Sequence, residues 1–95
     1  MGDKVTVYYS SICSTLDIKK KQKRIEDILG TKYKQITIEY KDIANSDDLK
    51  AEMRDIAKNE HAIVPQIARG GVYLGDYDKF DAAVEGEFLE EFLKN

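Results

Sequence analysis

Residues 63–74 read IVPQIARGGVYL, two short apolar runs joined by Gly70 and Gly71. Glycine adopts positive φ angles at little cost, so a Gly-Gly pair between two such runs predicts a tight β-hairpin. Pro65, the single proline of the chain, stands just before the first strand of this hairpin. Because a tight turn joins antiparallel strands, we expect this part of the sheet to be antiparallel.

The stretch before the hairpin has the spacing of a strand, a helix and a second strand. Residues 4–9 (KVTVYY) are rich in β-formers, and residues 35–40 alternate polar and apolar side chains, as is typical of strands. Between them, Ser14 and Asp17 resemble a capping box, and a helically spaced apolar series follows as far as Gly30, the expected helix end. Strands joined by such a crossover helix are parallel.

Two more helical regions complete the pattern. Ser46 is expected to cap a helix. Behind it, Leu49, Met53 and Ile56 recur at helical spacing. Apolar residues keep such spacing again from Tyr77 until Gly86, after which residues 88–93 are expected to form a short terminal helix. The order β-α-β-α-β-β-α therefore predicts an α/β fold in which helices flank a mixed four-stranded sheet.

Composition and charge narrow the classes of function. The 95 residues are expected to form one domain, residues 1–95, because a chain of this length cannot supply two hydrophobic cores. The net charge of −3 argues against a nucleic-acid partner, which basic surfaces bind. No apolar run approaches the roughly 20 residues that span a bilayer, and no signal-peptide pattern is present. We therefore expect a cytoplasmic protein without membrane contact.

The chain contains one cysteine, Cys13, and one histidine, His61. These two residues cannot form an internal disulfide or the four-ligand site of a structural zinc ion, so no metal site is expected. The basic run KKKQKR, residues 19–24, is the kind of tract that can direct nuclear import or bind an anionic partner. On a helix its side chains point in nearly all directions, so we expect a solvated helix surface and keep nuclear entry as the alternative.

The order of elements, with Cys13 just after the first strand and Pro65 just before the third, resembles the thioredoxin fold in its small glutaredoxin form. Five segments at near-identical spacing further resemble the SH3-domain-binding glutamic-acid-rich-like proteins: Val7-Tyr8, Glu52-Met53-Arg54, Pro65-Gln66-Ile67, Gly75-Asp76-Tyr77 and Glu91-Phe92-Leu93-Lys94. The resemblance covers essentially the whole chain. It implies a thioredoxin-like fold and a role as a modulator or adaptor, because members of that family usually lack the redox Cys-x-x-Cys motif.

Cys13 occupies the position where a glutaredoxin carries its nucleophilic cysteine, whereas Leu16 stands where the second cysteine would be. The sequence Cys-Ser-Thr-Leu therefore excludes dithiol exchange. A cysteine at the start of a helix can be activated by the helix dipole and backbone N–H groups, which lower the pKa of its thiol. The alternative is a small residue that fills a loop, and we favour that interpretation.

By the same resemblance, Pro65 corresponds to the cis-proline that faces the active-site loop, and Val64 to the residue whose backbone binds a thiol-bearing peptide. Tyr77 and Asp78 correspond to residues that bind the γ-glutamyl end of glutathione, and Gly75 precedes them as in glutaredoxins. The alternative is purely structural: the proline ends a loop, and the turn before Tyr77 starts a helix.

Two features depart from these families. Asp76 stands where glutaredoxins usually have a second glycine, and its negative charge opposes an anionic tripeptide. Whether glutathione binds is therefore open. The sequence also contains no PxxP motif, so SH3 recognition through a polyproline turn lacks its usual determinant.

We expect a non-catalytic, glutaredoxin-like module of the cytosol that binds a protein partner, as a monomer and without a cofactor. The alternative is a monothiol glutaredoxin-type oxidoreductase, in which Cys13 attacks a glutathionylated protein and a second glutathione releases it. In that version Val64, Tyr77 and Asp78 position the tripeptide. A shared iron–sulfur cluster is a weaker option, because the Cys-Gly-Phe-Ser motif of such glutaredoxins is missing.

Overall fold

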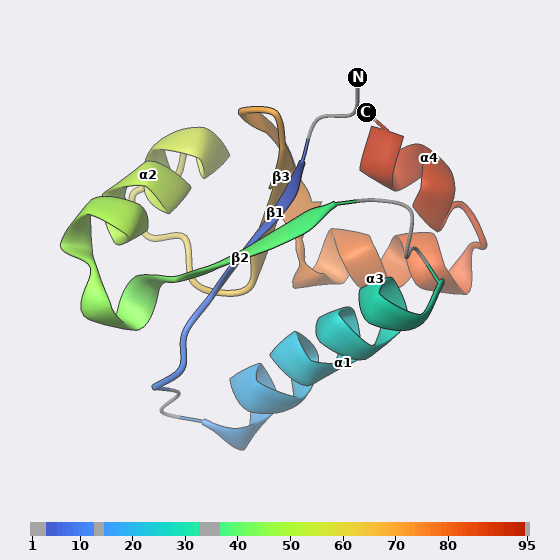
Figure 1. Cartoon of the computed structure of the whole chain (residues 1–95), viewed down its shortest axis with the longest axis horizontal. Coiled ribbons are helices and arrows are strands. Elements are labelled where there is room, and N and C mark those ends of the chain that lie inside the picture. The colour runs from blue at the N-terminus through green and yellow to red at the C-terminus, as the bar shows by residue number, and fades with distance from the viewer. Residues whose placement is uncertain (1–3, 13–14, 33–36, 95) are drawn as a thin grey trace.

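The computed structural model describes residues 4–12, 15–32 and 37–94. Its elements, in chain order, are β1 (Val5–Tyr9), α1 (Leu16–Lys32), β2 (Ile38–Asp42), the 3-10 helix η1 (Ile43–Asn45), α2 (Asp47–Ala57), β3 (Gln66–Arg69), β4 (Val72–Asp76), α3 (Tyr77–Glu85) and α4 (Leu89–Lys94). The strands form one four-stranded sheet in the order β2-β1-β3-β4 (Figure 1). β1 is parallel to β2 and antiparallel to β3, which is antiparallel to β4. The predicted mixed sheet with flanking helices is confirmed.

The hairpin that joins β3 to β4 turns at the predicted glycine pair. Gly70 and Gly71 have φ angles of 56° and 85°, a region that glycine adopts without steric cost. β3 begins at Gln66, directly after Pro65, because proline has no N–H to contribute to a β-ladder. The glycine turn and the proline therefore bound this strand at its two ends.

α1 runs two residues beyond the predicted stop. Gly30 was expected to end the helix, which instead continues to Lys32. Leu29 is fully buried and holds this last turn against the core, which outweighs the roughly 1 kcal/mol cost of a helical glycine. Ser14, expected to cap the start of this helix, lies outside the described residues.

β2 lies further along the chain than expected. The predicted strand covered residues 35–40, whereas β2 runs to Asp42, and residues 35–36 lie outside the described part of the chain. Asp42 pairs with Tyr9, the last residue of β1, so the parallel partner sets where this strand ends.

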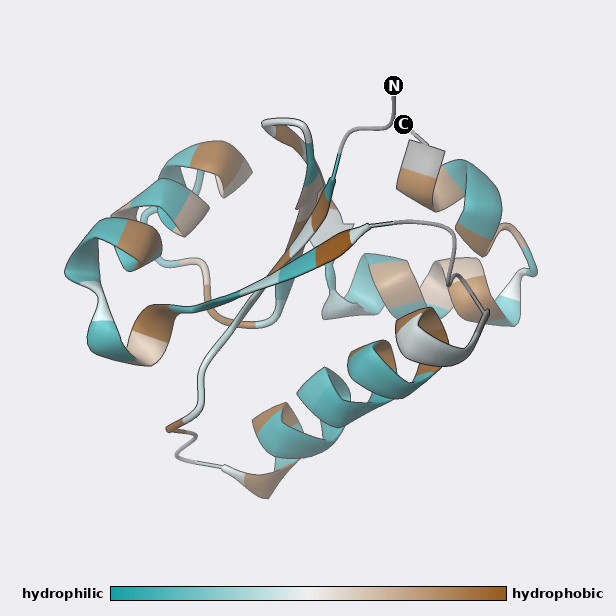
Figure 2. Cartoon of the chain, viewed as in Figure 1, coloured by the Kyte–Doolittle hydropathy of each residue, from teal (hydrophilic) through white to brown (hydrophobic). Residues whose placement is uncertain are grey.

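Helices cover both faces of the sheet, with α1, α3 and α4 on one side and α2 on the other (Figure 1). The larger buried cluster, called here the three-helix core, contains Val5, Val7, Ile25, Leu29, Ile67, Leu74, Phe80, Ala83, Leu89, Phe92 and Leu93. The smaller one, the α2 core, contains Tyr8, Met53, Ala62, Val64 and Ala68. Figure 2 shows α1 and α2 as mostly hydrophilic ribbons with recurring hydrophobic residues, as expected of helices that bury one side. No helix of the described residues has the length and hydrophobicity to cross a membrane.

α2 begins where the sequence predicts. The hydroxyl of Ser46 accepts a hydrogen bond of 3.1 Å from the amide of Leu49, which satisfies one of the free N–H groups of the first turn. Met53, on the predicted inner side, is 1% exposed. The predicted cap and the burial of Met53 are confirmed.

The start of α3 is set by a tight, capped turn. A carboxylate oxygen of Asp76 accepts a hydrogen bond of 3.0 Å from the amide of Lys79. Gly75 has no room for a side chain, since a Cβ built there would lie 2.8 Å from the Cβ of Lys79. This close approach places Tyr77 and Asp78 in the first turn of α3, at the end of β4.

Candidate functional site

A groove lies beside the segment that precedes β3. The peptide bond between Val64 and Pro65 is cis, as the resemblance to glutaredoxins implies. The groove has a volume of about 320 Å³ and is lined by residues 63–66, by residues 76–78 and by Thr15, Asp17, Ile18 and Lys21. Four predicted site residues therefore line one groove: Val64, Pro65, Tyr77 and Asp78.

The other two predicted site residues are placed differently. Gly75 is buried directly before the groove-lining residues 76–78 and provides the tight turn rather than a wall. Cys13, the candidate nucleophile, lies outside the described residues. Of its described neighbours, Ile12 is 72% exposed, and Leu16, at the position of the second glutaredoxin cysteine, is 70% exposed.

The backbone of Val64 is unpaired within the described part of the chain. Neither its amide nor its carbonyl has a hydrogen-bond partner among the residues that the structure describes. The neighbouring carbonyl of Ile63, in contrast, accepts a hydrogen bond of 2.7 Å from the side-chain amide of Gln66. The side chain of Val64 is held in the α2 core while the residue lines the groove. Such a residue can pair with an extended chain as one step of a β-ladder.

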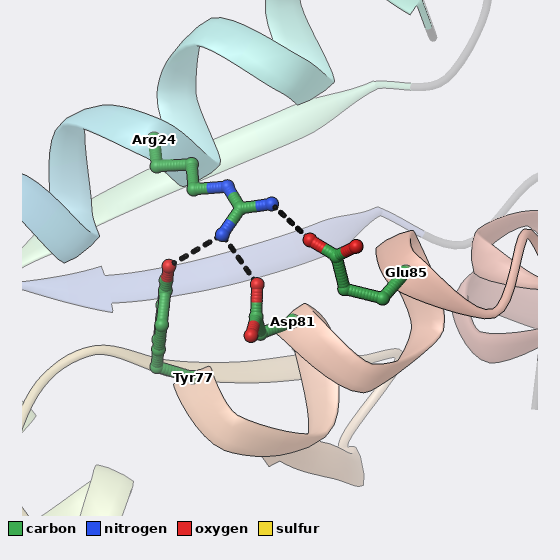
Figure 3. A network of polar contacts seen from close by, with 4 residues as sticks. All are labelled: Arg24, Tyr77, Asp81 and Glu85. Atoms are coloured by element: carbon green, nitrogen blue, oxygen red, sulfur yellow. Dashed lines mark hydrogen bonds and ion pairs between the residues drawn. The ribbon is translucent and has the colours of Figure 1, made fainter.

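Tyr77 is held in place from α1. The guanidinium of Arg24 donates a hydrogen bond of 3.0 Å to the Tyr77 hydroxyl and also contacts Asp81 and Glu85 of α3 (Figure 3). The ammonium of Lys21 lies 5.4 Å from the centre of the Tyr77 ring, within reach of a cation–π contact. Because its hydroxyl is engaged by Arg24, Tyr77 contributes mainly its ring to the groove.

Lys21 and Arg24 were not predicted to belong to this site. Both come from the basic run at residues 19–24. Their spacing of three residues places them on one side of α1, and this spacing is the sequence signal that links them to the same site. Lys19 and Lys23 of the same run line a separate hollow of about 500 Å³ between α1 and the strands β1 and β2. That hollow contains none of the predicted site residues.

Carboxylates dominate the charge of the groove. Asp17, Asp76 and Asp78 line it with one cation, Lys21, so three negative charges and one positive charge give a formal charge of −2. The Nζ atom of Lys21 lies 3.1 Å from a carboxylate oxygen of Asp17, and this hydrogen bond raises the pKa of the lysine. A groove of this sign disfavours an anionic ligand such as glutathione. Within the described residues, no three potential metal ligands of the His, Cys, Asp and Glu types come together.

The sequence matches a known protein family over nearly its whole length. A sequence model of the family described as "SH3-binding, glutamic acid-rich protein" matches residues 3–95. A Drosophila melanogaster protein described as "SH3 domain-binding glutamic acid-rich protein homolog" is 30% identical over 102 residues. That match covers 93% of this chain and 62% of the fly protein, so the chain spans less than two thirds of that relative.

Solved structures with a similar fold include an actin-interacting protein and a glutaredoxin. The C. albicans actin interacting protein Aip5 has a TM-score of 0.74 at 22% identity, covering 96% of this chain and 88% of that chain. A buckwheat glutaredoxin–glutathione complex has a TM-score of 0.65 at 17% identity, covering 97% and 77% of the two chains. At these identities the likeness shows the fold alone, which is the predicted thioredoxin-like α/β fold.

Proposed function

The chain belongs to the SH3-binding, glutamic acid-rich protein family, and we propose that it is a non-catalytic, glutaredoxin-like module that binds a protein partner in the groove beside Pro65. We propose further that it acts as a cytoplasmic monomer without a cofactor. The residues that correspond to the glutathione site of glutaredoxins would then hold a peptide segment of another protein.

The observation that carries this proposal is that the backbone of Val64, next to exposed apolar side chains, has no hydrogen-bond partner among the described residues. Ile12 and Ile63 are 72% and 63% exposed and line a hollow that shares Val64 with the groove. Exposed apolar side chains beside an unpaired backbone are typical of surfaces that bind other proteins. A protein partner is also what the description of Aip5, a protein of similar fold, names for that protein.

Two features argue against thiol–disulfide chemistry. Leu16 stands at the position of the second glutaredoxin cysteine and cannot resolve a disulfide. The carboxylates that line the groove repel the carboxylates of glutathione, which a monothiol mechanism needs as its reductant.

A second candidate function is supported by the gathering of Val64, Pro65, Tyr77 and Asp78 around one groove, where they could hold glutathione. In this monothiol mechanism, the thiolate of Cys13 attacks the glutathione sulfur of a mixed disulfide, and the protein thiol leaves. A second glutathione then attacks the new disulfide, which yields oxidised glutathione and regenerates the Cys13 thiolate.

Site-specific crosslinking tests the binding function. A photo-reactive amino acid at Ile63, which is 63% exposed beside the groove, is compared with one at Val72, which is 56% exposed on β4. We expect protein adducts from position 63 in cell extract that exceed those from position 72 and that decrease with Ile12→Glu. Equal adducts at both positions would contradict binding in this groove.

Turnover separates the two functions. The full chain is mixed with a glutathionylated peptide and glutathione. The rate of peptide reduction is followed with glutathione reductase as the coupling enzyme. We expect a rate equal to the background without protein, because the groove disfavours glutathione. A clear rate that Cys13→Ser abolishes would establish the monothiol enzyme instead.

A further inference from the structure

The candidate groove continues into a second hollow of opposite charge. This hollow of about 180 Å³ shares Ile18, Ile63 and Val64 with the groove, so the two lie on either side of the Ile63–Val64 segment. Lys50 and Arg54 of α2 line it, and none of its described lining residues is a carboxylate. We call it the basic hollow, and we call the groove with its charge of −2 the acidic hollow.

Charges at both ends are available to a ligand. Asp78 in the acidic hollow and Lys50 in the basic hollow are exposed, and neither side chain has a hydrogen bond or salt bridge among the described residues. Arg54 donates from Nε to the carbonyl of Ala62 at 3.2 Å, which holds its guanidinium beside the basic hollow. A bound segment can therefore form new ion pairs without breaking ion pairs already present.

The course of the backbone past the two hollows sets the direction in which a paired peptide would run. Residues 62–64 line the basic hollow and residues 63–66 line the acidic one, so the chain runs from the basic end toward the acidic end. In an antiparallel ladder, one residue exchanges both hydrogen bonds with the residue opposite, which satisfies the amide and the carbonyl of Val64 together. A segment paired in this way has its N-terminal side at the acidic hollow.

Few backbone groups of this segment are able to form hydrogen bonds with a bound peptide. The choice between peptides therefore depends on contacts with side chains. Pro65 has no N–H to donate, and the carbonyl of Ile63 is already bonded to Gln66. Among the described residues of this segment, Val64 is therefore the one whose amide and carbonyl are both left to pair. The exposed side chain of Ile63, which lines both hollows, offers an apolar contact between the two charged ends, and exposed Ile12 adds apolar surface in the basic hollow.

We propose that the two hollows together select an extended peptide segment that carries a basic side chain on the N-terminal side of an apolar centre and an acidic side chain on the C-terminal side. This inference rests on the proposed function, because it assigns charge and direction to the partner of the same groove. The basic side chain pairs with Asp78, and the acidic one pairs with Lys50 and Arg54.

Two capped peptides of identical composition test the direction: acetyl-KTVTE-amide and its reverse, acetyl-ETVTK-amide. Alternate residues of a strand share one side, so the two charges and the central valine point the same way. Binding is followed at low salt, where surface charges are least screened, by amide chemical shifts of the isotopically labelled full chain. We expect acetyl-KTVTE-amide to shift the Val64 amide and to bind about fivefold to tenfold more tightly than its reverse, as two exposed ion pairs allow.

The remaining results of the peptide experiment would overturn either the polarity of the bound peptide or the binding groove itself. Equal binding of both peptides at Val64, or tighter binding of the reverse peptide, would overturn the polarity and leave the groove as a binding site. No shift of Val64 with either peptide would overturn the proposed groove, and the polarity with it.

A charge exchange in the protein provides the matching test. The double variant Lys50→Glu with Asp78→Lys keeps the net charge of the chain but brings each hollow to a formal charge of zero, so we expect it to lose the preference for acetyl-KTVTE-amide. The control double variant, Lys20→Glu with Asp55→Lys, changes exposed residues that do not line either hollow and is expected to keep the original preference. The single variant Lys50→Glu leaves the first turn of α3 intact and is expected to lose most of the preference. An unchanged preference in this single variant would overturn the proposal.

Discussion

The two faces of the sheet are built differently. The three-helix core contains eleven described residues, all apolar, whereas the α2 core contains five, one of which is a tyrosine. The hydroxyl of that tyrosine, Tyr8, donates a hydrogen bond of 2.5 Å to Glu52 of α2, and the Nζ atom of Lys41 lies 3.0 Å from the same carboxylate oxygen. The larger buried cluster is thus entirely apolar, whereas the smaller one includes a tyrosine whose hydroxyl makes a polar contact at the rim.

The two buried clusters differ in how they relate to the candidate site. Val64 belongs to the smaller α2 core and also lines the groove. Tyr77, which lines the opposite wall, packs against the larger core through its ring. We infer that the three-helix core supplies most of the free energy of folding, while the α2 core positions the residue that the proposed partner contacts.

Phe80→Ala is expected to have the largest effect. Phe80 is fully buried in the three-helix core, with its ring 6.4 Å from that of Phe92. We expect a loss of about 3–5 kcal/mol in the free energy of unfolding, measured by urea denaturation, because the lost transfer energy and the cavity add. The exposed control Val72→Ala should stay within about 0.5 kcal/mol of wild type. A smaller loss for Phe80→Ala than for Met53→Ala would invalidate the comparison of the two faces.

Met53→Ala tests the smaller core. Met53 is 1% exposed and packs in the cluster that contains Val64. We expect a loss of about 2–3 kcal/mol, at the low end for a buried methionine, and a shift of the Val64 amide in the folded protein. A loss below about 0.5 kcal/mol would show that the inner side of α2 has been misassigned.

Tyr8→Phe removes the polar contact at the rim of the α2 core and leaves the ring in place. Glu52 is partly exposed, so water can replace the lost hydroxyl on the carboxylate side. We therefore expect a loss of about 1 kcal/mol at neutral pH in the same denaturation experiment. A value as large as that of Phe80→Ala would mean that polar contacts, rather than apolar burial, dominate the α2 face.

The pH dependence of that last difference is the smallest expected effect. The hydrogen bond from Tyr8, and then the contact with Lys41, hold the pKa of Glu52 below its ordinary value of 4.5. The folded protein therefore binds this proton less tightly than the unfolded chain, so the contribution is fully present above about pH 4.5 and is lost as the pH falls further. We expect the stability difference between wild type and Tyr8→Phe to shrink between about pH 6 and about pH 3. A difference that grows toward low pH would reverse the assigned direction.

The spacing of residues close together in the sequence predicts most of the helices, strands and turns. The glycine turn at Gly70 and Gly71, the cap at Ser46 and the burial of Met53 follow from patterns within a few residues of chain, because turns, caps and amphipathic faces are local requirements. Gly30 shows the limit of such patterns. The stop signal was present, but the burial of Leu29 against the core overrode it.

The site required contacts that no local pattern contains. The resemblance pointed to Val64, Pro65, Tyr77 and Asp78, which the fold brings to one groove. The hydrogen bond between Arg24 and Tyr77 joins residues 53 positions apart. The opposite charges of the two hollows come from α1, α2, β4 and α3 together. Sequence periodicity reports which side of an element is buried, whereas only the packing of the elements decides which charges and which unpaired backbone groups meet at one surface.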